Sequence, residues 1–258
     1  MFAPAGCATV NPTLTPARVL RPGHGAFDLG TAYQAPVVAA ALGAAHTAAG
    51  EITRGNNTAA NQDALARGTI AFAQVPPGPA PYVAGRVGIA GDNEAHFAVA
   101  GRTMRLGARH RFWTDSTGDW ALTLGVQARV APLAVLMDGT VPGVSVASSW
   151  LAGGDVALLV GRTSSELYDI WIGARAGYTH AGGSLQSMSL NGGAAFDATL
   201  DRVDAALTLG LRVGFGHVAG MIEAEIAGGY YQAAASFGAS ASGGVLALVP
   251  AAALRLQF

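Results

Sequence analysis

The feature that most constrains this chain is a two-residue alternation of apolar and polar positions, clearest over residues 201–215. Leu207 and Leu209 belong to the apolar set, whereas Asp204 belongs to a set of small or charged residues. Successive side chains of a β-strand point to opposite faces, so the pattern predicts a strand with one apolar and one polar face. Residues 218–231 repeat the pattern after only two intervening residues, which predicts a tight hairpin.

The same period predicts strands along most of the chain. They are expected at residues 25–34, 81–90, 95–112, 119–130, 155–161, 167–180, 201–215, 218–231 and 244–258. Single-chain bacterial outer-membrane barrels have an even number of strands, so a tenth is expected between residues 131 and 154, with eight or twelve strands as alternatives. Short and long connections then fall on opposite ends of an up-and-down barrel.

Composition excludes several other classes of protein. Hydrophobic residues make up 51% of the 258 residues, charged residues make up 12%, and the formal net charge is −1. A disordered chain would carry more charge, and a nucleic-acid-binding protein would show a basic excess. The one cysteine excludes a disulfide framework. The long uncharged stretches of the chain are too rich in Ala, Gly and Ser to be membrane-spanning helices.

Strand length and aromatic spacing favour a barrel that faces lipid. The predicted strands reach 10 to 15 residues, whereas strands of soluble proteins have about 5 to 6. Tyr168 and Tyr178 share a face, and their separation along a tilted strand projects to roughly 25 Å, the height of the apolar band between two aromatic girdles. Trp113 and Trp120 flank a polar turn and complete the predicted girdle. We therefore predict an all-β, transmembrane antiparallel up-and-down β-barrel of about ten strands.

Both ends of the sequence resemble features of Gram-negative outer-membrane proteins. Leu254, Leu256 and Phe258 alternate up to the last residue, which resembles the assembly signal of outer-membrane β-barrels. Pro4–Cys7 resembles a lipobox, so Cys7 is a lipidation candidate, with an incidental thiol as the alternative. The resemblance to uncharacterised outer-membrane barrels implies location in the outer membrane of a Gram-negative bacterium. It also implies the lipid bilayer and the barrel assembly machinery as partners.

The predicted domain division follows from these two ends. Residues 1–24 are expected to form an N-terminal leader or periplasmic segment, and residues 25–258 are expected to form the barrel. Both ends of the barrel segment are then expected on the periplasmic side.

Charged residues on the polar faces of the strands are predicted to meet in the lumen. Buried charges must be paired, so we interpret the set as a structural salt-bridge network, with a narrow ion or solute path as the alternative. The Glu223/Glu225 pair is interpreted as two partners for arginines rather than as an acid/base pair. The predicted network is Asp28, Arg105, Arg109, Arg129, Asp169, Arg175, Asp204, Arg212, Glu223, Glu225 and Arg255.

No motif in the sequence names an activity. His110 and His180 fall near strand ends, but no spacing defines a catalytic triad, a metal site or a phosphate-binding loop, and no cofactor is expected. We predict a non-enzymatic protein with a structural or surface-interaction role through long extracellular loops, for which the sequence names no ligand. The alternatives are a narrow ion or small-solute channel, an outer-membrane enzyme, and a soluble β-barrel that binds a small apolar ligand.

Overall fold

The computed structural model describes residues 12–37, 40–62, 64–65, 78–101, 103–132, 144–164, 167–187, 195–236, 238 and 240–258. The strands form one closed antiparallel barrel in which the first strand pairs with both the second and the tenth. The elements are β1 (Gly25–Pro36), α1 (Ala40–Thr53), β2 (Gly78–Ile89), β3 (Asn93–Ala100), β4 (Thr103–Thr114), β5 (Trp120–Pro132), β6 (Val144–Ser164), β7 (Tyr168–Ser187), β8 (Ala195–Phe215), β9 (Val218–Ala235) and β10 (Ser240–Gln257). The predicted fold class and the strand number are confirmed.

The position predicted for the tenth strand is wrong. Residues 95–112, predicted as one strand, form the hairpin of β3 and β4, whose turn contains Gly101 at φ +59°. Residues 133–143 lie outside the described residues, and residues 144–161 belong to the single long strand β6. A signal for the hairpin was present, because the outward positions change from odd (Phe97) to even (Leu106) across it.

The two ends of the barrel differ in their connections. The turns β2–β3, β4–β5, β6–β7 and β8–β9 span 3, 5, 3 and 2 residues by the strand bounds, and they share an end with the start of β1 and the end of β10. We call this the short-turn end. The opposite, long-loop end carries the β1–β2 connection with α1, and the connections after β5 and β7. The predicted alternation of short and long connections is thus present in part, because the β3–β4 and β9–β10 connections at the long-loop end are short.

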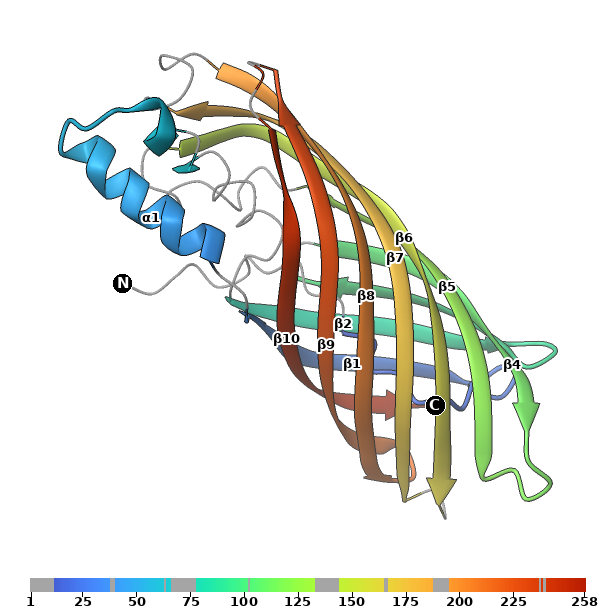
Figure 1. The fold of residues 1–258 in the computed structure, drawn as a ribbon. Coiled ribbons are helices and arrows are strands. Elements are labelled where there is room, and N and C mark those ends of the chain that lie inside the picture. Colours follow the sequence, from blue (N-terminus) through green and yellow to red (C-terminus); the bar gives the residue numbers. More distant parts are fainter. Residues whose placement is uncertain are drawn as a thin grey trace.

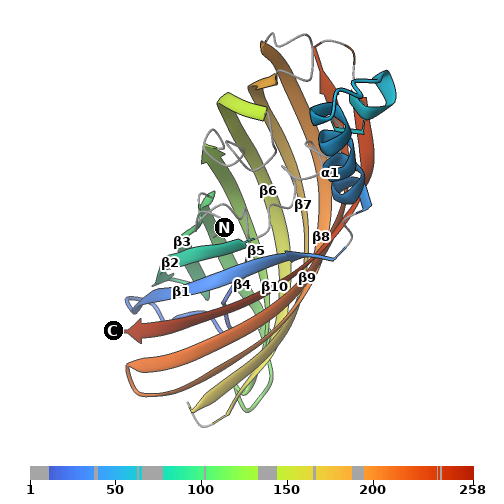
Figure 2. The same cartoon turned by 90° about the vertical axis from the view of Figure 1, so that its left-hand side faces the viewer.

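The barrel wall is much taller on one side than on the other. Strands β6, β7 and β8 contain 21, 20 and 21 residues, whereas β3 contains 8. Figures 1 and 2 show β6–β10 rising well above β1–β3, with α1 beside the upper part of this wall. A tilted strand needs only about 9–11 residues to cross a bilayer, so the tall strands continue far beyond that span. Among the described residues, no helix is long and apolar enough to cross a membrane.

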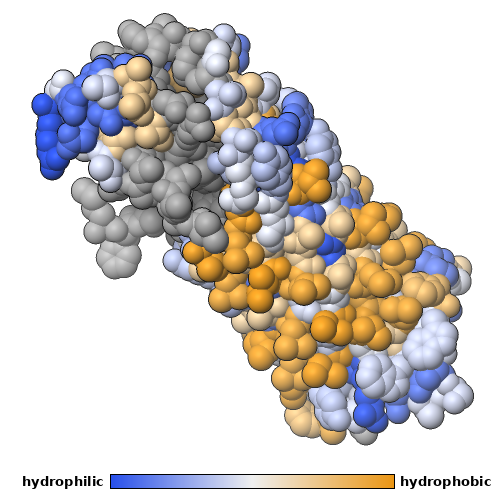
Figure 3. Space-filling view, in the orientation of Figure 1, coloured by the Kyte–Doolittle hydropathy of each residue, from blue (hydrophilic) through white to orange (hydrophobic). Residues whose placement is uncertain are grey.

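Large apolar side chains cover the outside of the barrel. Along β8, Val203, Leu207 and Leu209 are 63%, 63% and 56% exposed, whereas the intervening Asp204 and Ala206 are buried. Figure 3 shows a band of apolar residues over the lower half of the barrel, with polar residues at its lower end. A soluble protein rarely exposes so large a continuous apolar surface, and this distribution matches a barrel that faces lipid.

The predicted girdle and C-terminal residues also lie on the outer surface. Trp113, Trp120 and Tyr168 are half-exposed near the short-turn end, and Tyr178 lies ten residues further along β7. The C-terminal residues that resemble an assembly signal, Leu254, Leu256 and Phe258, are 63%, 51% and 71% exposed.

Replacing Leu207 by Arg is expected to lower the free energy of unfolding in lipid vesicles by about 2–4 kcal/mol, because Leu207 lies near the middle of the apolar band. The matched control, Val213→Arg, lies in the row of Tyr168 and should cost only about 0–1 kcal/mol. Denaturant titration in vesicles measures both values. Equal effects of the two variants would show that the apolar band does not face a bilayer.

Candidate functional site

The lumen of the barrel is occupied by the chain's own N-terminal segment. We predicted residues 12–24 as part of a leader or periplasmic segment. Residues 12–20 run inside the barrel, where Leu14, Ala17 and Val19 are buried, and residues 21–24 continue as an exposed turn to β1. We call residues 12–24 the lumen segment. Residues 1–11, including the lipidation candidate Cys7, lie outside the described residues.

Glu223 on β9 is the main anchor of the lumen segment. Its carboxylate accepts hydrogen bonds from the Thr13 backbone N–H at 2.7 Å, the Thr13 hydroxyl at 2.7 Å and the Leu14 N–H at 2.8 Å. The indole N–H of Trp171 donates to the same carboxylate at 3.2 Å. Four donors thus surround one buried charge, and each hydrogen bond to a charged acceptor is stronger than a neutral one.

Arginines of the barrel wall bind the carbonyl groups of the lumen segment. Arg86 donates to the Leu14 carbonyl oxygen at 2.7 Å, and Arg109 donates to that of Pro16 at 2.7 Å. The segment contains prolines and is not part of the sheet, so its buried backbone groups depend on side chains for partners.

Gly88 on β2 allows the lumen segment to approach the wall. A Cβ atom at this position would lie 2.1 Å from the Arg21 carbonyl oxygen, which is far inside a normal contact. Gly88 also donates its N–H to the His24 carbonyl at 2.9 Å and accepts from the Gly23 N–H at 3.0 Å. The end of the lumen segment is therefore held at the short-turn end by backbone hydrogen bonds.

One group of ion pairs lies at the level of the lumen segment. The Asp28 carboxylate binds Arg86 at 2.9 Å and Arg255 at 2.7 Å. Glu94 binds Arg109 at 2.8 Å and also accepts the Leu20 N–H at 3.0 Å. These carboxylates hold the same arginines that bind the segment's carbonyl groups, so the network and the segment stabilise each other.

A second group of ion pairs is formed by β5, β6, β7, β8 and β9. Arg175 lies between Asp204 at 3.1 Å and Glu225 at 2.8 Å, and Arg129 binds Asp204 at 2.9 Å. Asp155 lies 3.8 Å from both arginines. All of these side chains are at most 5% exposed, so their charges are compensated within the protein rather than by bulk water.

The structure places all the predicted network residues inside the barrel, but in separate groups rather than in one chain of contacts. Arg212 binds Asp169 at 2.5 Å near the short-turn end, and Arg105 lies over the Tyr82 ring at 5.9 Å. Sequence reasoning omitted four buried participants and the partly buried Arg202. Arg86, Asp155, Trp171 and Arg202 share the alternate positions of the predicted set, whereas Glu94 was assigned to a turn.

The two histidines considered for catalysis lie on the outer surface. His110 contacts the Asn93 side-chain oxygen at 3.1 Å, and the His180 Nδ1 lies 2.8 Å from an Asp201 carboxylate oxygen. The His180 ring packs against Trp150 with centroids 5.3 Å apart. Within the described parts of the chain, no group of His, Cys, Asp and Glu could hold a metal ion.

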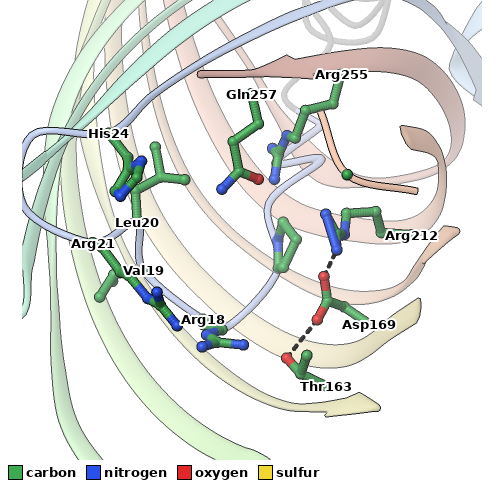
Figure 4. Close-up of a pocket in the computed structure, with 12 residues that line it drawn as sticks. Arg18, Val19, Leu20, Arg21, His24, Thr163, Asp169, Arg212, Arg255 and Gln257 are labelled. Atoms are coloured by element: carbon green, nitrogen blue, oxygen red, sulfur yellow. Dashed lines mark hydrogen bonds and ion pairs between the residues drawn. The ribbon is translucent and has the colours of Figure 1, made fainter. Parts of the chain in front are cut away.

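A cavity of about 170 Å³ opens beside the lumen segment at the short-turn end (Figure 4). Arg18, Arg21 and His24 of the segment line one side, and Arg212, Asp169 and Thr163 of the wall line another. Arg255 and Gln257 of β10 complete its charged and polar lining. Among the described residues that line it, Asp169 is the one carboxylate, so the cavity is strongly basic.

No family model matches the chain, and no curated protein matches it. Solved structures that it resembles include Ail, the attachment invasion locus protein of Yersinia pestis, at 10% identity and a TM-score of 0.36, covering 92% of this chain and 99% of that one. A major outer membrane protein from Thermus thermophilus matches at 9% identity and a TM-score of 0.37, covering 91% and 99%. The outer membrane protease OmpT from Escherichia coli matches at 7% identity and 0.40, covering 94% and 100%. With all three TM-scores below 0.5, the role of this barrel is inferred from its own surface and lumen.

Glu223→Gln is expected to lower the free energy of unfolding by about 3 kcal/mol, because the amide removes the charge and replaces one of the two acceptor oxygens by an NH2 group that faces a donor. Proteolysis of the lumen segment should accelerate in the same variant. The control is Glu51→Gln on α1, which removes the surface ion pair with Arg54. It should leave the free energy of unfolding and the rate of proteolysis unchanged. Unchanged proteolysis in Glu223→Gln would contradict the role of this carboxylate as the anchor.

Proposed function

We propose that this chain is an outer-membrane β-barrel of a Gram-negative bacterium that is closed to solutes and has a structural or surface-interaction role. The observation that carries the proposal is the occupied lumen. Residues 13, 14, 16, 17, 18 and 20 of the lumen segment all make hydrogen bonds to the barrel wall. A barrel of about this size is already mostly filled by side chains, so the additional segment leaves little room for a solute path.

The outer surface supports the membrane location. Apolar residues face outward on all sides of the lower barrel, and the charged residues of the same strands face inward. A soluble barrel with an apolar ligand site would have the reverse arrangement, so this alternative is disfavoured. We propose that the short-turn end, where β1 begins and β10 ends, faces the periplasm, as the short turns of outer-membrane barrels do.

The tall wall of β6–β10 is the proposed interaction surface. Above the row of Tyr178 the outward positions of β8, β9 and β10 become polar or small, and they include Thr199, Asp201, Gln232, Ser240 and Ser242. Such residues suit water and lipid headgroups rather than acyl chains. The wall would then stand above the membrane, where a surface partner can reach it.

The enzymatic alternative has weaker support. His180 and Asp201 are hydrogen-bonded, but both are on the outward face beside Tyr178, where a polar side chain at the membrane interface needs no catalytic role. We therefore propose no enzymatic activity. Lipidation of Cys7 and recognition of Leu254, Leu256 and Phe258 by the barrel assembly machinery stay predictions.

The proposed orientation predicts which end reacts with a membrane-impermeant thiol reagent in intact cells. In a Cys7→Ser background, Ser240→Cys at the long-loop end should be labelled, because Ser240 is exposed above the apolar band. Thr117→Cys, in an exposed turn at the short-turn end, should be labelled only after the outer membrane is permeabilised. If only Thr117→Cys were labelled in intact cells, the proposed orientation would be reversed. If both variants were found in the soluble fraction and labelled equally there, the membrane location would be overturned.

Closure of the lumen predicts no steady conductance for the full chain in planar bilayers. Deletion of residues 12–20 should produce a small, stable conductance, because it removes the segment but leaves the turn at residues 21–24. The gel-mobility shift on boiling checks that the shortened barrel is folded, and Glu223→Gln provides a milder opening if the deletion does not fold. Steady conductance of the full chain would favour the channel alternative.

A further inference from the structure

We propose that the basic cavity at the short-turn end binds a small soluble anion that carries a phosphate group. The cavity shares Arg255 with the ion-pair group that holds the lumen segment, but its other charged lining residues, Arg18, Arg21, Asp169 and Arg212, lie outside that group. It is formed where residues 16–24 of the lumen segment pass the short-turn ends of β6, β7 and β8, at Thr163, Asp169 and Arg212. Its volume of about 170 Å³ greatly exceeds the roughly 10–15 Å³ that one water molecule needs.

Most charges that line the cavity are already compensated. Arg255 is bound to Asp28 at 2.7 Å, and Arg212 is bound to Asp169 at 2.5 Å. Asp169 also accepts a hydrogen bond from the Thr163 hydroxyl. This carboxylate therefore has two partners of its own and does not neutralise the cavity.

Arg18 and Arg21 are the uncompensated charges. Among the described residues, neither guanidinium lies within ion-pair distance of a carboxylate. Figure 4 shows both side chains on one side of the cavity, across from Asp169 and Arg212. The cavity thus has two unpaired positive charges, to which His24 adds a further ring nitrogen donor or acceptor.

Two uncompensated guanidinium groups match the charge of a phosphate group near neutral pH, which is about −1.5 to −2. Guanidinium forks bind phosphate oxygens in pairs, and a tetrahedral anion can accept them from several directions. Gln257 supplies a neutral amide donor to the same cavity. With the orientation proposed above, the site opens to the periplasm, so the ligand would be free inorganic phosphate or a soluble phosphate ester.

The test is a titration of the full chain, refolded in a maltoside detergent that contains no phosphate, with inorganic phosphate followed by ³¹P NMR. Saturable line broadening is expected at constant ionic strength, and chloride at the same ionic strength should not displace it. The double variant R18Q/R21Q should bind at least about tenfold more weakly, because each lost charge-assisted hydrogen bond weakens binding by about this factor. Arg21→Gln alone, at an exposed position, should give an intermediate affinity and serves as the second variant.

The matched control is Arg162→Gln. Arg162 is exposed on the outside of β6 near the same end of the barrel and lies over the Trp120 ring at 5.9 Å. Its removal should leave phosphate binding unchanged. The site would be overturned by broadening that does not saturate, or by an R18Q/R21Q variant that binds phosphate as tightly as the unchanged chain. It would also be overturned if Arg162→Gln weakened binding as much as R18Q/R21Q does. Citrate that displaces phosphate at equal or lower concentration would overturn phosphate as the ligand class. The gel-mobility shift on boiling reports separately whether each variant forms the barrel.

Discussion

The pairing of buried arginines with buried carboxylates is the interaction on which the interior of this barrel depends. Arg175, for example, is within 3.1 Å of one aspartate and 2.8 Å of one glutamate, and its side chain is 3% exposed. Removal of one member of such a group leaves an uncompensated charge away from water, which costs far more than the net stability that an intact pair provides. The network therefore restricts which side chains can fill the lumen more than it stabilises the fold.

The same constraint explains how a proline-containing, irregular segment can pass through the barrel. Its amide groups are bound by carboxylates such as Glu223, and its carbonyl groups are bound by arginines such as Arg86. Wall and segment thus have complementary partners. Because the arginines are themselves held by carboxylates such as Asp28, displacement of the segment would disturb charges on several strands at once.

The side chains on the outside of the barrel are those that suit lipid rather than water. Backbone groups that face lipid must be satisfied within the protein, and the closed hydrogen-bonded sheet satisfies them without leaving an edge. Apolar side chains then cover the outer face, while β8, β9 and β10 change to small and polar outward residues above it. One continuous sheet therefore serves as the membrane-spanning barrel at one end and as the proposed surface wall at the other.

The sequence by itself determined the strands, their faces and the barrel class, because the two-residue period is local and each strand carries it whatever its partner. It also assigned Asp204, Glu223 and Arg255 to the lumen for this reason. The hairpin at Gly101 was missed, because a two-residue turn interrupts a long alternating stretch only by a change of phase. Only the tertiary structure decided the pairing of Arg175 with Glu225, 50 positions away, because a periodic pattern contains no information on register between distant strands. The same holds for residues 12–24, whose non-periodic sequence gives no local sign that side chains more than 200 positions away bind its backbone.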